Sequence, residues 1–276
     1  MIKKSPSLKN LTPGANLISK GYFSGEHSIA FKKLSRSESK FDKVCFVFPG
    51  QGSVYPGMFK EEYLAHSVIR NKFKKTDKFA LKYGLHKPSD YILSPEKIPS
   101  DQIDITANLC LFTLEAGLHE LLISLGVKPR VITGHSFGEF AALVASGIIS
   151  FEQMLELVYY RDVWSPKKND AGFMVAINAN KKKIRKILAN TNYYVSNLNS
   201  PEQTVISVVP KDLEVIKKIL KKAKIRLKVL DVPQPYHSPL LEDVGSKMGK
   251  LLKLRKLSLQ KPKIWIFSSV SKQLIN

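Results

Sequence analysis

The sequence predicts an α/β protein in which a smaller ferredoxin-like βαββαβ unit is inserted into a larger parallel α/β body. In the first half, short apolar runs that end in glycine turns alternate with stretches of helical periodicity. Residues 172–231 instead follow the order strand, helix, strand, strand, helix, strand. With 276 residues, 43% of them hydrophobic, the chain can bury the core of one large domain or two closely packed ones.

The body is predicted from alternating strand and helix signals joined by short connections. Leucines at 111, 114, 118, 121, 122 and 125 mark one apolar face of a long helix, which Gly126 and Pro129 end. Alternation of this kind is typical of a parallel sheet layered with helices. The expected elements are a strand at 43–49 entering a tight turn at 50–53, helices at 57–83 and 103–125, a strand at 130–133, a helix at 137–146 and a strand at 264–270.

The smaller unit is predicted from strands at 172–178, 193–199, 204–210 and 225–232 with helices at 181–189 and 211–223. Each helix places its isoleucines and leucines on one side and its lysines on the other, so it should cover a sheet. The predicted organisation is an N-terminal arm or linker at 1–42, a body formed by 43–170 and 233–276, and the ferredoxin-like unit at 171–232.

The charge of the chain is strongly positive. Lys and Arg number 44 against 23 Asp and Glu, a net charge of +21, and +10 of it falls between Lys181 and Lys228. Such an excess suits an acidic protein, nucleic acid or an anionic surface, or it is merely a set of solvated helix faces. Because no helix-turn-helix, zinc or aromatic-platform signature accompanies the charge, nucleic-acid binding is the weakest of these interpretations.

The number of cysteines and the length of the apolar runs indicate the cellular compartment that the sequence favours. Cys45 and Cys110 are too few for a disulfide framework or a multi-cysteine zinc site. No apolar stretch approaches 18 residues, so we expect no membrane insertion, and the start of the chain lacks the apolar region of a secretory signal. The sequence thus predicts a cytoplasmic protein, and it contains no metal cluster or nucleotide-binding glycine loop.

The motif that carries chemistry is Gly134-His135-Ser136-Phe137-Gly138, a G-x-S-x-G between a predicted strand and a predicted helix. In a nucleophile elbow the glycines allow a sharp turn that lifts the serine hydroxyl clear of the sheet, at the positive end of the following helix. Ser136 is therefore the predicted nucleophile. The alternative is an ordinary N-cap serine with no base nearby.

A nucleophilic serine needs a proton acceptor, and the chain has six histidines. His237 is the strongest candidate because it follows the last strand of the small unit in a proline-rich loop, Pro233–Pro239, that can fix its orientation. The alternative is a structural loop histidine. His135 adjoins the serine, but so tight a turn should point its side chain away from Ser136.

The tetrahedral oxyanion of an acyl transfer needs two N–H donors. The backbone N–H of Phe137 is one candidate, and the backbone N–H of Gln51 in the Gly50-Gln51-Gly52 turn is the other. The alternative for the second is a simple glycine turn.

Five motifs occur in a fixed order: FPGQGS at 48–53, GHSFGE at 134–139, an arginine 25 residues after the serine, NSP at 199–201 and YHS at 236–238. Over residues 43–276 the chain thereby resembles malonyl-CoA:acyl carrier protein transacylases and the acyltransferase domains of polyketide synthases. The resemblance implies an α/β-hydrolase-like large subdomain with a ferredoxin-like small subdomain. It also implies a Ser–His dyad that works by a ping-pong acyl-enzyme route in polyketide or fatty acid biosynthesis.

Carried over by position, Ser136 and His237 would be catalytic, and Gln51 and Phe137 would form the oxyanion hole. Arg161 would grip the free carboxylate of a malonyl group, for which a guanidinium is chemically suited. Asn199, His135 and Tyr236 would contact substrate, and an aromatic residue before the histidine resembles the malonyl type. Coenzyme A would enter as a thioester substrate with no resident cofactor or metal. The partner would be an acidic acyl carrier protein, carrying phosphopantetheine, that docks near residues 181–228.

The sequence also departs from the family pattern. Asn108-Leu109 stands where relatives show Gln-Pro, Val54 replaces a common glutamine, and the body is expected to be incomplete at its C-terminus because relatives continue past the equivalent of Asn276. Two other interpretations stay open. One is an acyl-thioester hydrolase of the same fold, which Arg161 argues against, and the other is a catalytically impaired docking module.

Overall fold

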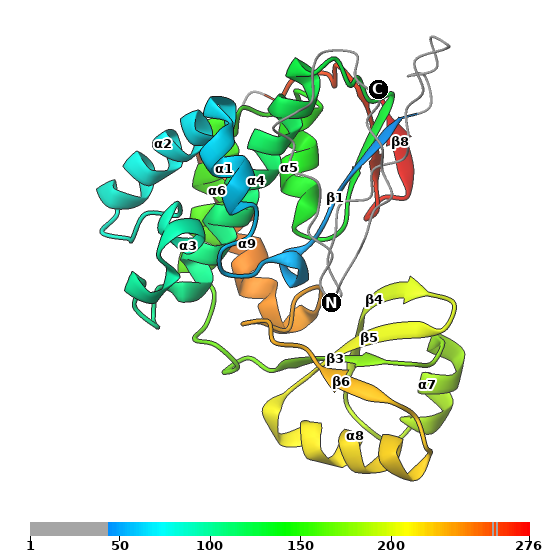
Figure 1. Cartoon of the computed structure of the whole chain (residues 1–276). Coiled ribbons are helices and arrows are strands. Elements are labelled where there is room, and N and C mark those ends of the chain that lie inside the picture. The colour runs from blue at the N-terminus through cyan, green and yellow to red at the C-terminus, as the bar shows by residue number, and fades with distance from the viewer. Residues whose placement is uncertain (1–43, 256, 258) are drawn as a thin grey trace, which may run out of the picture. The chain divides into compact units, whose positions relative to one another are not determined.

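The computed structural model describes residues 44–255, 257 and 259–276, so the predicted arm at 1–42 lies outside the described residues (Figure 1). The described chain forms two compact units. Unit 1 extends to Tyr159 and resumes at Leu257, and unit 2 comprises Tyr160–Lys256. Residues 160–170 and 233–256, which the sequence analysis assigned to the body, thus group with the smaller unit.

Unit 1 is a helix-covered sheet. Its strand order is β1-β2-β7-β8, with β1, β2 and β7 mutually parallel and β8 antiparallel to β7. The predicted strands and helices are present with shifts of a few residues at their ends. The helices and strands are β1 (Cys45–Phe48), α1 (Lys60–Ala65), α2 (Ser67–Lys82), α3 (Asp90–Leu93), α4 (Ile103–Ser124), β2 (Val131–Gly134), α5 (Gly138–Ala145), α6 (Phe151–Val163, which runs into unit 2), β7 (Trp265–Ser268) and β8 (Gln273–Ile275).

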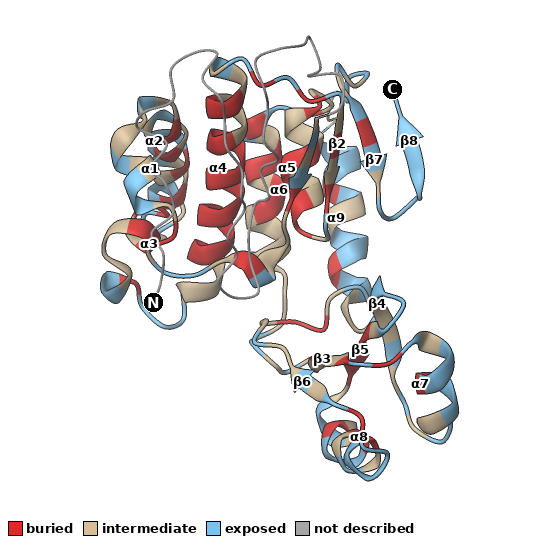
Figure 2. Ribbon diagram, turned by 45° about the vertical axis from the view of Figure 1, so that its right-hand side comes forward, coloured by how far each residue is buried: buried red, intermediate tan, exposed pale blue. Residues whose placement is uncertain are grey.

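The long helix α4 forms the centre of unit 1 (Figure 2). Every residue from Thr106 to Leu118 is buried, because α2 packs on one side of the helix and α5 on another. The expectation of a single apolar face was therefore too narrow, since a helix enclosed by neighbours buries its whole circumference.

The two faces of the unit 1 sheet differ. Ile132 and Ile266, which are register partners on β2 and β7, are buried in the core. Val47, Trp265 and Phe267 point to the opposite face and are 58%, 41% and 39% exposed. This alternation is the period of two that strands impose on their side chains.

The helical region predicted at about 57–83 is divided in the structure into two helices, α1 and α2. His66 adopts an extended conformation with φ −114° and ψ 116°, so α1 ends before it and α2 begins after it. His66 still donates to the Glu62 carbonyl at 3.0 Å and accepts from the Arg70 N–H at 3.3 Å, but its backbone lies outside the helical φ/ψ region, so one helix cannot run through it. The sequence offers no proline or glycine there to signal the break.

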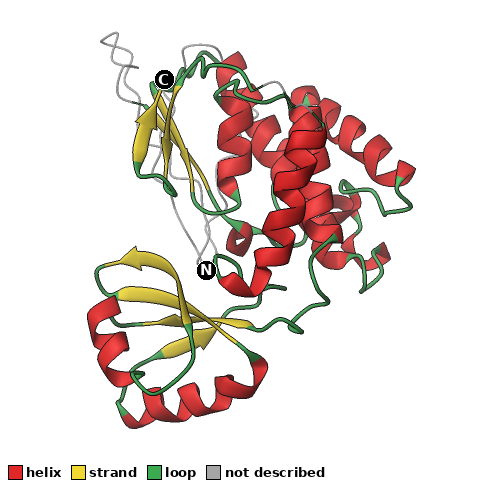
Figure 3. Cartoon of the chain, turned by 180° about the vertical axis from the view of Figure 1, so that it is seen from behind, coloured by secondary structure: helices red, strands yellow, loops and turns green. Residues whose placement is uncertain are grey.

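Unit 2 contains the predicted βαββαβ fold, followed by one helix that was not predicted (Figure 3). All strand pairs in the sheet are antiparallel, and the order is β4-β5-β3-β6. This confirms the predicted fold class. The elements are β3 (Phe173–Ile177), α7 (Lys181–Ile187), β4 (Tyr194–Ser200), β5 (Gln203–Val208), α8 (Pro210–Lys222), β6 (Leu227–Val229) and α9 (Glu242–Leu254).

The core of unit 2 lies between its sheet and the inner sides of α7 and α8. Val175, Ile206 and Val208 from the strands meet Ile184 of α7 and Ile216 of α8, and all five are fully buried. At about 25 cal/mol per Å² of apolar surface removed from water, such side chains each contribute about 1.5–3 kcal/mol. The lysines of both helices are left on the outer surface.

In the described part of the chain, no helix is long and apolar enough to cross a membrane.

Candidate active site

Ser136 lies in a sharp turn between β2 and α5. Its φ is +54°, a left-handed conformation that few residues other than glycine adopt. The turn is closed by backbone hydrogen bonds from Gly138 N–H to the His135 carbonyl at 3.0 Å and from Glu139 N–H to the Ser136 carbonyl at 3.0 Å. Helix α5 thus begins at once after the serine, with Phe137 and not Ser136 at its N-cap position. This is the strand–turn–helix geometry of a nucleophile elbow.

Neither glycine of the motif can carry a Cβ without a steric clash. A Cβ added to Gly134 would collide with the backbone of Gly138 and Glu139, and a Cβ on Gly138 would collide with the carbonyl oxygens of Phe48 and Pro49. The helix start is therefore pressed against the ends of β2 and β1. Ser136 itself is half-buried and Phe137 is buried, whereas the side chain of His135 is exposed.

The turn that carries Gln51 lies against the elbow. A Cβ on Gly50 would stand 3.0 Å from the His135 carbonyl oxygen and 3.6 Å from Cβ of Ser136. The His135 N–H donates to the Phe48 carbonyl at 2.9 Å, which ties the end of β1 to the residue before the nucleophile. Unit 1 therefore brings together the predicted nucleophile and both segments predicted to supply its oxyanion donors, Gln51 and Phe137.

The side chain of Gln51 is hydrogen-bonded to helix α4. Its Nε2 donates to Oδ1 of Asn108 at 2.6 Å, and Asn108 is only 4% exposed on helix α4. In the sequence, Asn108 differs from the family pattern and carries no signal of a role.

A second contact missed by the sequence analysis joins the elbow to the turn after β7. Oε1 of Glu139 accepts hydrogen bonds from the backbone N–H of Ser269, at 2.7 Å, and from its hydroxyl. Helix α5 is thereby tied to a segment 130 residues later in the chain. Neither Asn108 nor Ser269 carries a sequence signal for this role, because the contact depends on where the fold places each residue.

In unit 2 the guanidinium of Arg161 lies over the ring of Tyr236, 4.4 Å from the ring centre to Cζ. Its Nη1 donates to Oδ1 of Asp162 at 2.7 Å, and both side chains are largely buried. Burial lowers the pKa of Arg161, but the charges and hydrogen bonds of Tyr236 and Asp162 more than offset it, so the pKa lies above its ordinary value. Arg161 is accordingly a fixed positive charge.

The loop that carries His237 is held rigidly within unit 2. The fully buried Gln234 donates from Nε2 to the Pro166 carbonyl at 2.7 Å, and the Asn169 N–H donates to the Pro233 carbonyl at 3.1 Å. His237 follows with φ +57° and an exposed side chain. Unit 2 therefore brings Arg161 and Tyr236 into contact, with His237 next in the chain.

Asn199 lies near the end of β4. Its side chain is exposed, and Nδ2 donates to Oε1 of Gln203 at 3.0 Å across the β4–β5 hairpin. This contact is what the alternative, a residue of the Ser200-Pro201 turn, would make.

The predicted site residues thus fall into two groups. Gln51, His135, Ser136 and Phe137 belong to unit 1, while Arg161, Asn199, Tyr236 and His237 belong to unit 2. The approach of His237 to Ser136 stays a prediction.

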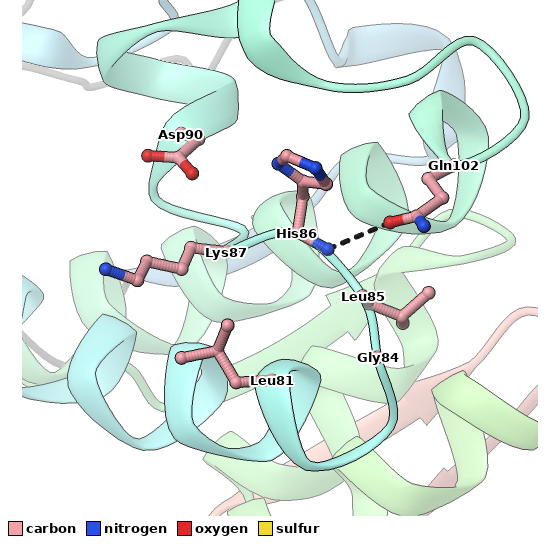
Figure 4. A pocket seen from close by; sticks show the side chains of 7 residues that line it. All are labelled: Leu81, Gly84, Leu85, His86, Lys87, Asp90 and Gln102. Carbon is pink, nitrogen blue, oxygen red and sulfur yellow. Dashed lines mark hydrogen bonds between the residues drawn. The ribbon is translucent and has the colours of Figure 1, made fainter.

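Unit 1 also contains a hollow of about 370 Å³ (Figure 4). It is lined by Leu81, Gly84, Leu85, His86, Lys87, Asp90 and Gln102, and none of these is a predicted site residue. The His86 N–H donates to Oε1 of Gln102 at 2.9 Å, which ties the α2–α3 loop to the start of α4. We assign this hollow no role in the chemistry.

Comparison with known proteins decides the family. A family profile described as "Acyl transferase domain" matches residues 45–275, nearly all of the described chain. The chain belongs to this acyl transferase family. The resemblance found in the sequence is thereby confirmed.

Curated relatives of this acyl transferase domain include the non-reducing polyketide synthase fsr1 of Gibberella fujikuroi. It is 31% identical over 224 residues, which cover 80% of this chain and 10% of that protein. Norsolorinic acid synthase of Dothistroma septosporum is 30% identical over 216 residues, covering 76% and 9%. The domain therefore spans about a tenth of the length of these curated relatives.

Solved structures agree with the family. The acyltransferase domain from the second module of the salinomycin polyketide synthase is 28% identical with a TM-score of 0.71, covering 84% of this chain and 54% of that one. The malonyl CoA-acyl carrier protein transacylase of Coxiella burnetii is 28% identical with a TM-score of 0.70, covering 81% and 71%. The α/β-hydrolase-like body with a ferredoxin-like subdomain is therefore the fold of this domain.

Proposed function

We propose that this acyl transferase domain moves a malonyl group from malonyl-CoA to the phosphopantetheine thiol of an acyl carrier protein through an acyl-serine intermediate. The observation that carries the proposal is the elbow, where a left-handed Ser136 sits between two glycines that cannot be replaced. The similarity to a malonyl CoA-acyl carrier protein transacylase favours malonyl as the acyl group. The expected setting is polyketide or fatty acid biosynthesis in the cytoplasm.

In the first half-reaction, Oγ of Ser136 attacks the thioester carbonyl carbon and passes its proton to His237. The N–H groups of Gln51 and Phe137 stabilise the oxyanion. The carbon–sulfur bond then breaks, and the CoA thiolate takes the proton from His237. In the second half-reaction, the carrier thiol gives its proton to His237 and attacks the acyl-serine. The ester bond breaks, and Oγ of Ser136 recovers the proton.

Arg161 supplies the acyl selectivity in this scheme. A guanidinium has five N–H donors in a planar fork that matches a carboxylate, and the stack on Tyr236 and the bond to Asp162 hold that plane in one orientation. The free carboxylate of a malonyl group would pair with it. We propose that His135, Tyr236 and Asn199 line the same substrate path and that no resident cofactor or metal takes part.

The decisive experiment is mass spectrometry of a holo acyl carrier protein after incubation with malonyl-CoA and the domain. We expect a malonyl mass gain with the wild type and none with Ser136→Ala. A gain that persists in Ser136→Ala would contradict the acyl-serine route. Release of free malonate without a carrier product would point to a thioester hydrolase, and failure of malonyl-CoA to label Ser136 would point to a docking module.

A second arm tests the selectivity assigned to Arg161. Arg161→Ala should lower the rate with malonyl-CoA by about 10²-fold or more, since a charge-assisted bidentate contact is lost, and should favour acetyl-CoA relative to malonyl-CoA. Ser136 labelling by a fluorophosphonate, which carries no carboxylate, should be unchanged. An equal loss with all three reagents would contradict the carboxylate-binding role.

A further inference from the structure

Helix α4 makes a polar contact with the turn that carries one of the two proposed oxyanion donors. Nε2 of Gln51 lies 2.6 Å from Oδ1 of Asn108, 57 residues away in the chain. Asn108 is one of the few polar residues in the buried middle of α4 and is 4% exposed. An amide in such surroundings is costly to bury unless it is hydrogen-bonded, so this contact is selected by the fold and is not incidental.

The turn itself is closed but small. Ser53 donates to the Gly50 carbonyl from its N–H at 3.0 Å and from its hydroxyl at 2.8 Å, and the Val54 N–H donates to the Gln51 carbonyl at 3.2 Å. These bonds fix the shape of residues 50–54. The Gln51 side chain adds a connection between this turn and a helix of the core.

The opposite side of the turn abuts the nucleophile. Gly50 approaches the His135 carbonyl and Cβ of Ser136 so closely that a Cβ would meet them at 3.0 and 3.6 Å. The turn thus contacts the elbow through Gly50 and contacts Asn108 through the side chain of Gln51. A displacement of the Gln51 backbone would move its N–H relative to Ser136.

We propose that Asn108 is a positioning residue for acyl transfer, which holds the side chain of Gln51 so that the backbone N–H of Gln51 points at the developing oxyanion. The proposal rests on the function proposed above. Asn108 touches no reacting atom. It acts from the most buried helix of unit 1, and a rigid element fixes a donor more accurately than a loop can by itself.

The test uses near-isosteric variants, so that no cavity is made. Asn108→Leu removes the acceptor, Gln51→Met removes the donor, and the double variant removes both. The readouts are the rate of fluorophosphonate labelling of Ser136 and the kcat and KM for malonyl transfer. Removing an oxyanion donor outright costs about 10²–10³ in kcat, so we expect a displaced donor to cost about 10- to 100-fold in kcat and in the labelling rate. KM should change less than twofold.

The pair should behave as a unit. The double variant is expected to be no slower than either single variant, and Asn108→Asp, which keeps an acceptor of the same shape, should recover most of the labelling rate. Thr106→Val on the same helix is the matched control. Its hydroxyl is fully buried and has no hydrogen-bond partner within the described part of the chain, so the variant should react like the wild type.

Three outcomes would overturn the proposal. The first is a lower thermal midpoint for Asn108→Leu with an unchanged labelling rate, which is what a purely structural role would give. The second is a double variant whose fold-loss in labelling rate and kcat equals the product of the losses in the two single variants. The third is a wild type that neither labels nor transfers, which removes the proposed function and this inference together. If the wild type labels but transfers no malonyl group, only the proposed acyl specificity fails, and the labelling rates still test Asn108.

Discussion

At the scale of single residues, backbone strain coincides with the proposed chemistry. Ser136 and His237 both have positive φ, at +54° and +57°. A residue other than glycine in this region costs about 1–3 kcal/mol and persists only where its surroundings enforce it. At Ser136 the enforcement comes from the close packing of Gly134 and Gly138, and near His237 it comes from the bonds of the Pro233–Pro239 loop. The folded state is therefore destabilised locally at Ser136 and at His237, the two residues predicted to transfer the proton.

The elbow should not tolerate a methyl group on its second glycine. Gly138→Ala places a Cβ against the carbonyl oxygens of Phe48 and Pro49, which cannot move without shifting the end of β1. We expect a loss of at least about 2 kcal/mol of stability, measured by urea unfolding. Gly245→Ala is the control, since that glycine lies exposed in helix α9 with nothing within 4 Å of an added Cβ.

Gly245→Ala should be stabilising by about 0.5–1 kcal/mol, because alanine has the higher helix propensity. Equal unfolding midpoints for the wild type and Gly138→Ala would show that the end of β1 yields, contrary to the packing described here.

At the scale of elements, helix α4 combines satisfied and unsatisfied buried polar groups. The hydroxyls of Thr76 and Thr113 lie 2.8 Å apart, and Thr113 also donates to the Leu109 carbonyl. Glu115 is 3% exposed, and neither of its carboxylate oxygens has a hydrogen-bond partner among the residues that the structure describes. Burial raises the pKa of Glu115 well above its usual range, so the side chain is held in its neutral form.

The raised pKa of Glu115 makes the stability of the folded protein depend on pH. In the unfolded chain Glu115 loses its proton near its ordinary pKa, whereas in the folded chain it keeps the proton to higher pH. The free energy of the unfolded state therefore falls as the pH rises above about 4.5, and the folded protein loses stability over that range. Glu115→Gln cannot ionise, so it should raise the thermal midpoint by a few degrees at pH 8.

The difference in thermal midpoint between Glu115→Gln and the wild type should disappear as the pH falls toward the ordinary glutamate pKa. Thermal melts between pH 4.5 and 8 measure this difference. A constant offset across that range would mean that Glu115 is ionised when folded. Glu96→Gln, on an exposed residue, provides the comparison.

Most elements were predictable because their signals are local. The apolar strand at 45–48, the leucines of α4 and the lysine-faced helices of unit 2 each show their periodicity in the sequence. The break at His66 was missed because no proline or glycine marks it, and β8 was missed because the strand is only three residues long. Ser136 stood out through its glycines, which the structure shows to be sterically required. Asn108 could not be predicted to hold Gln51, because only the fold brings residues 57 apart together.

At the scale of the whole molecule, the net charge of +21 is concentrated on unit 2. Glu214 pairs with Lys217, and otherwise the outer faces of α7 and α8 are dominated by exposed cations. The exposed basic residues of these two helices are Lys182, Lys183, Arg185, Lys186, Lys211, Lys218, Lys221 and Lys222. A field of one sign raises the rate at which an acidic partner arrives, and salt screens it.

Reversing two of these charges should slow the carrier step. We expect Lys218→Glu/Lys222→Glu to lower kcat/KM for an acidic acyl carrier protein about tenfold at low ionic strength, with the difference shrinking at 0.5 M salt. Lys74→Glu/Lys78→Glu on α2 changes the net charge equally, at exposed positions with the same spacing, and should have less than a twofold effect. An equal loss of kcat/KM in both double variants would show that the net charge of the domain sets the rate and that the location of the charges on α8 does not.

Unit 2 is one uninterrupted stretch of polypeptide, Tyr160–Lys256, whereas the elbow and the Gly50-Gln51-Gly52 turn both lie in the first of the two segments that form unit 1. A gene that recombined at just these two junctions would exchange the arginine, the aromatic ring and the histidine loop as a single cassette, leaving the nucleophile and its donors untouched. Under the roles proposed here, such an exchange would replace the carboxylate-binding arginine and the general base together, and the incoming histidine would have to serve the resident Ser136.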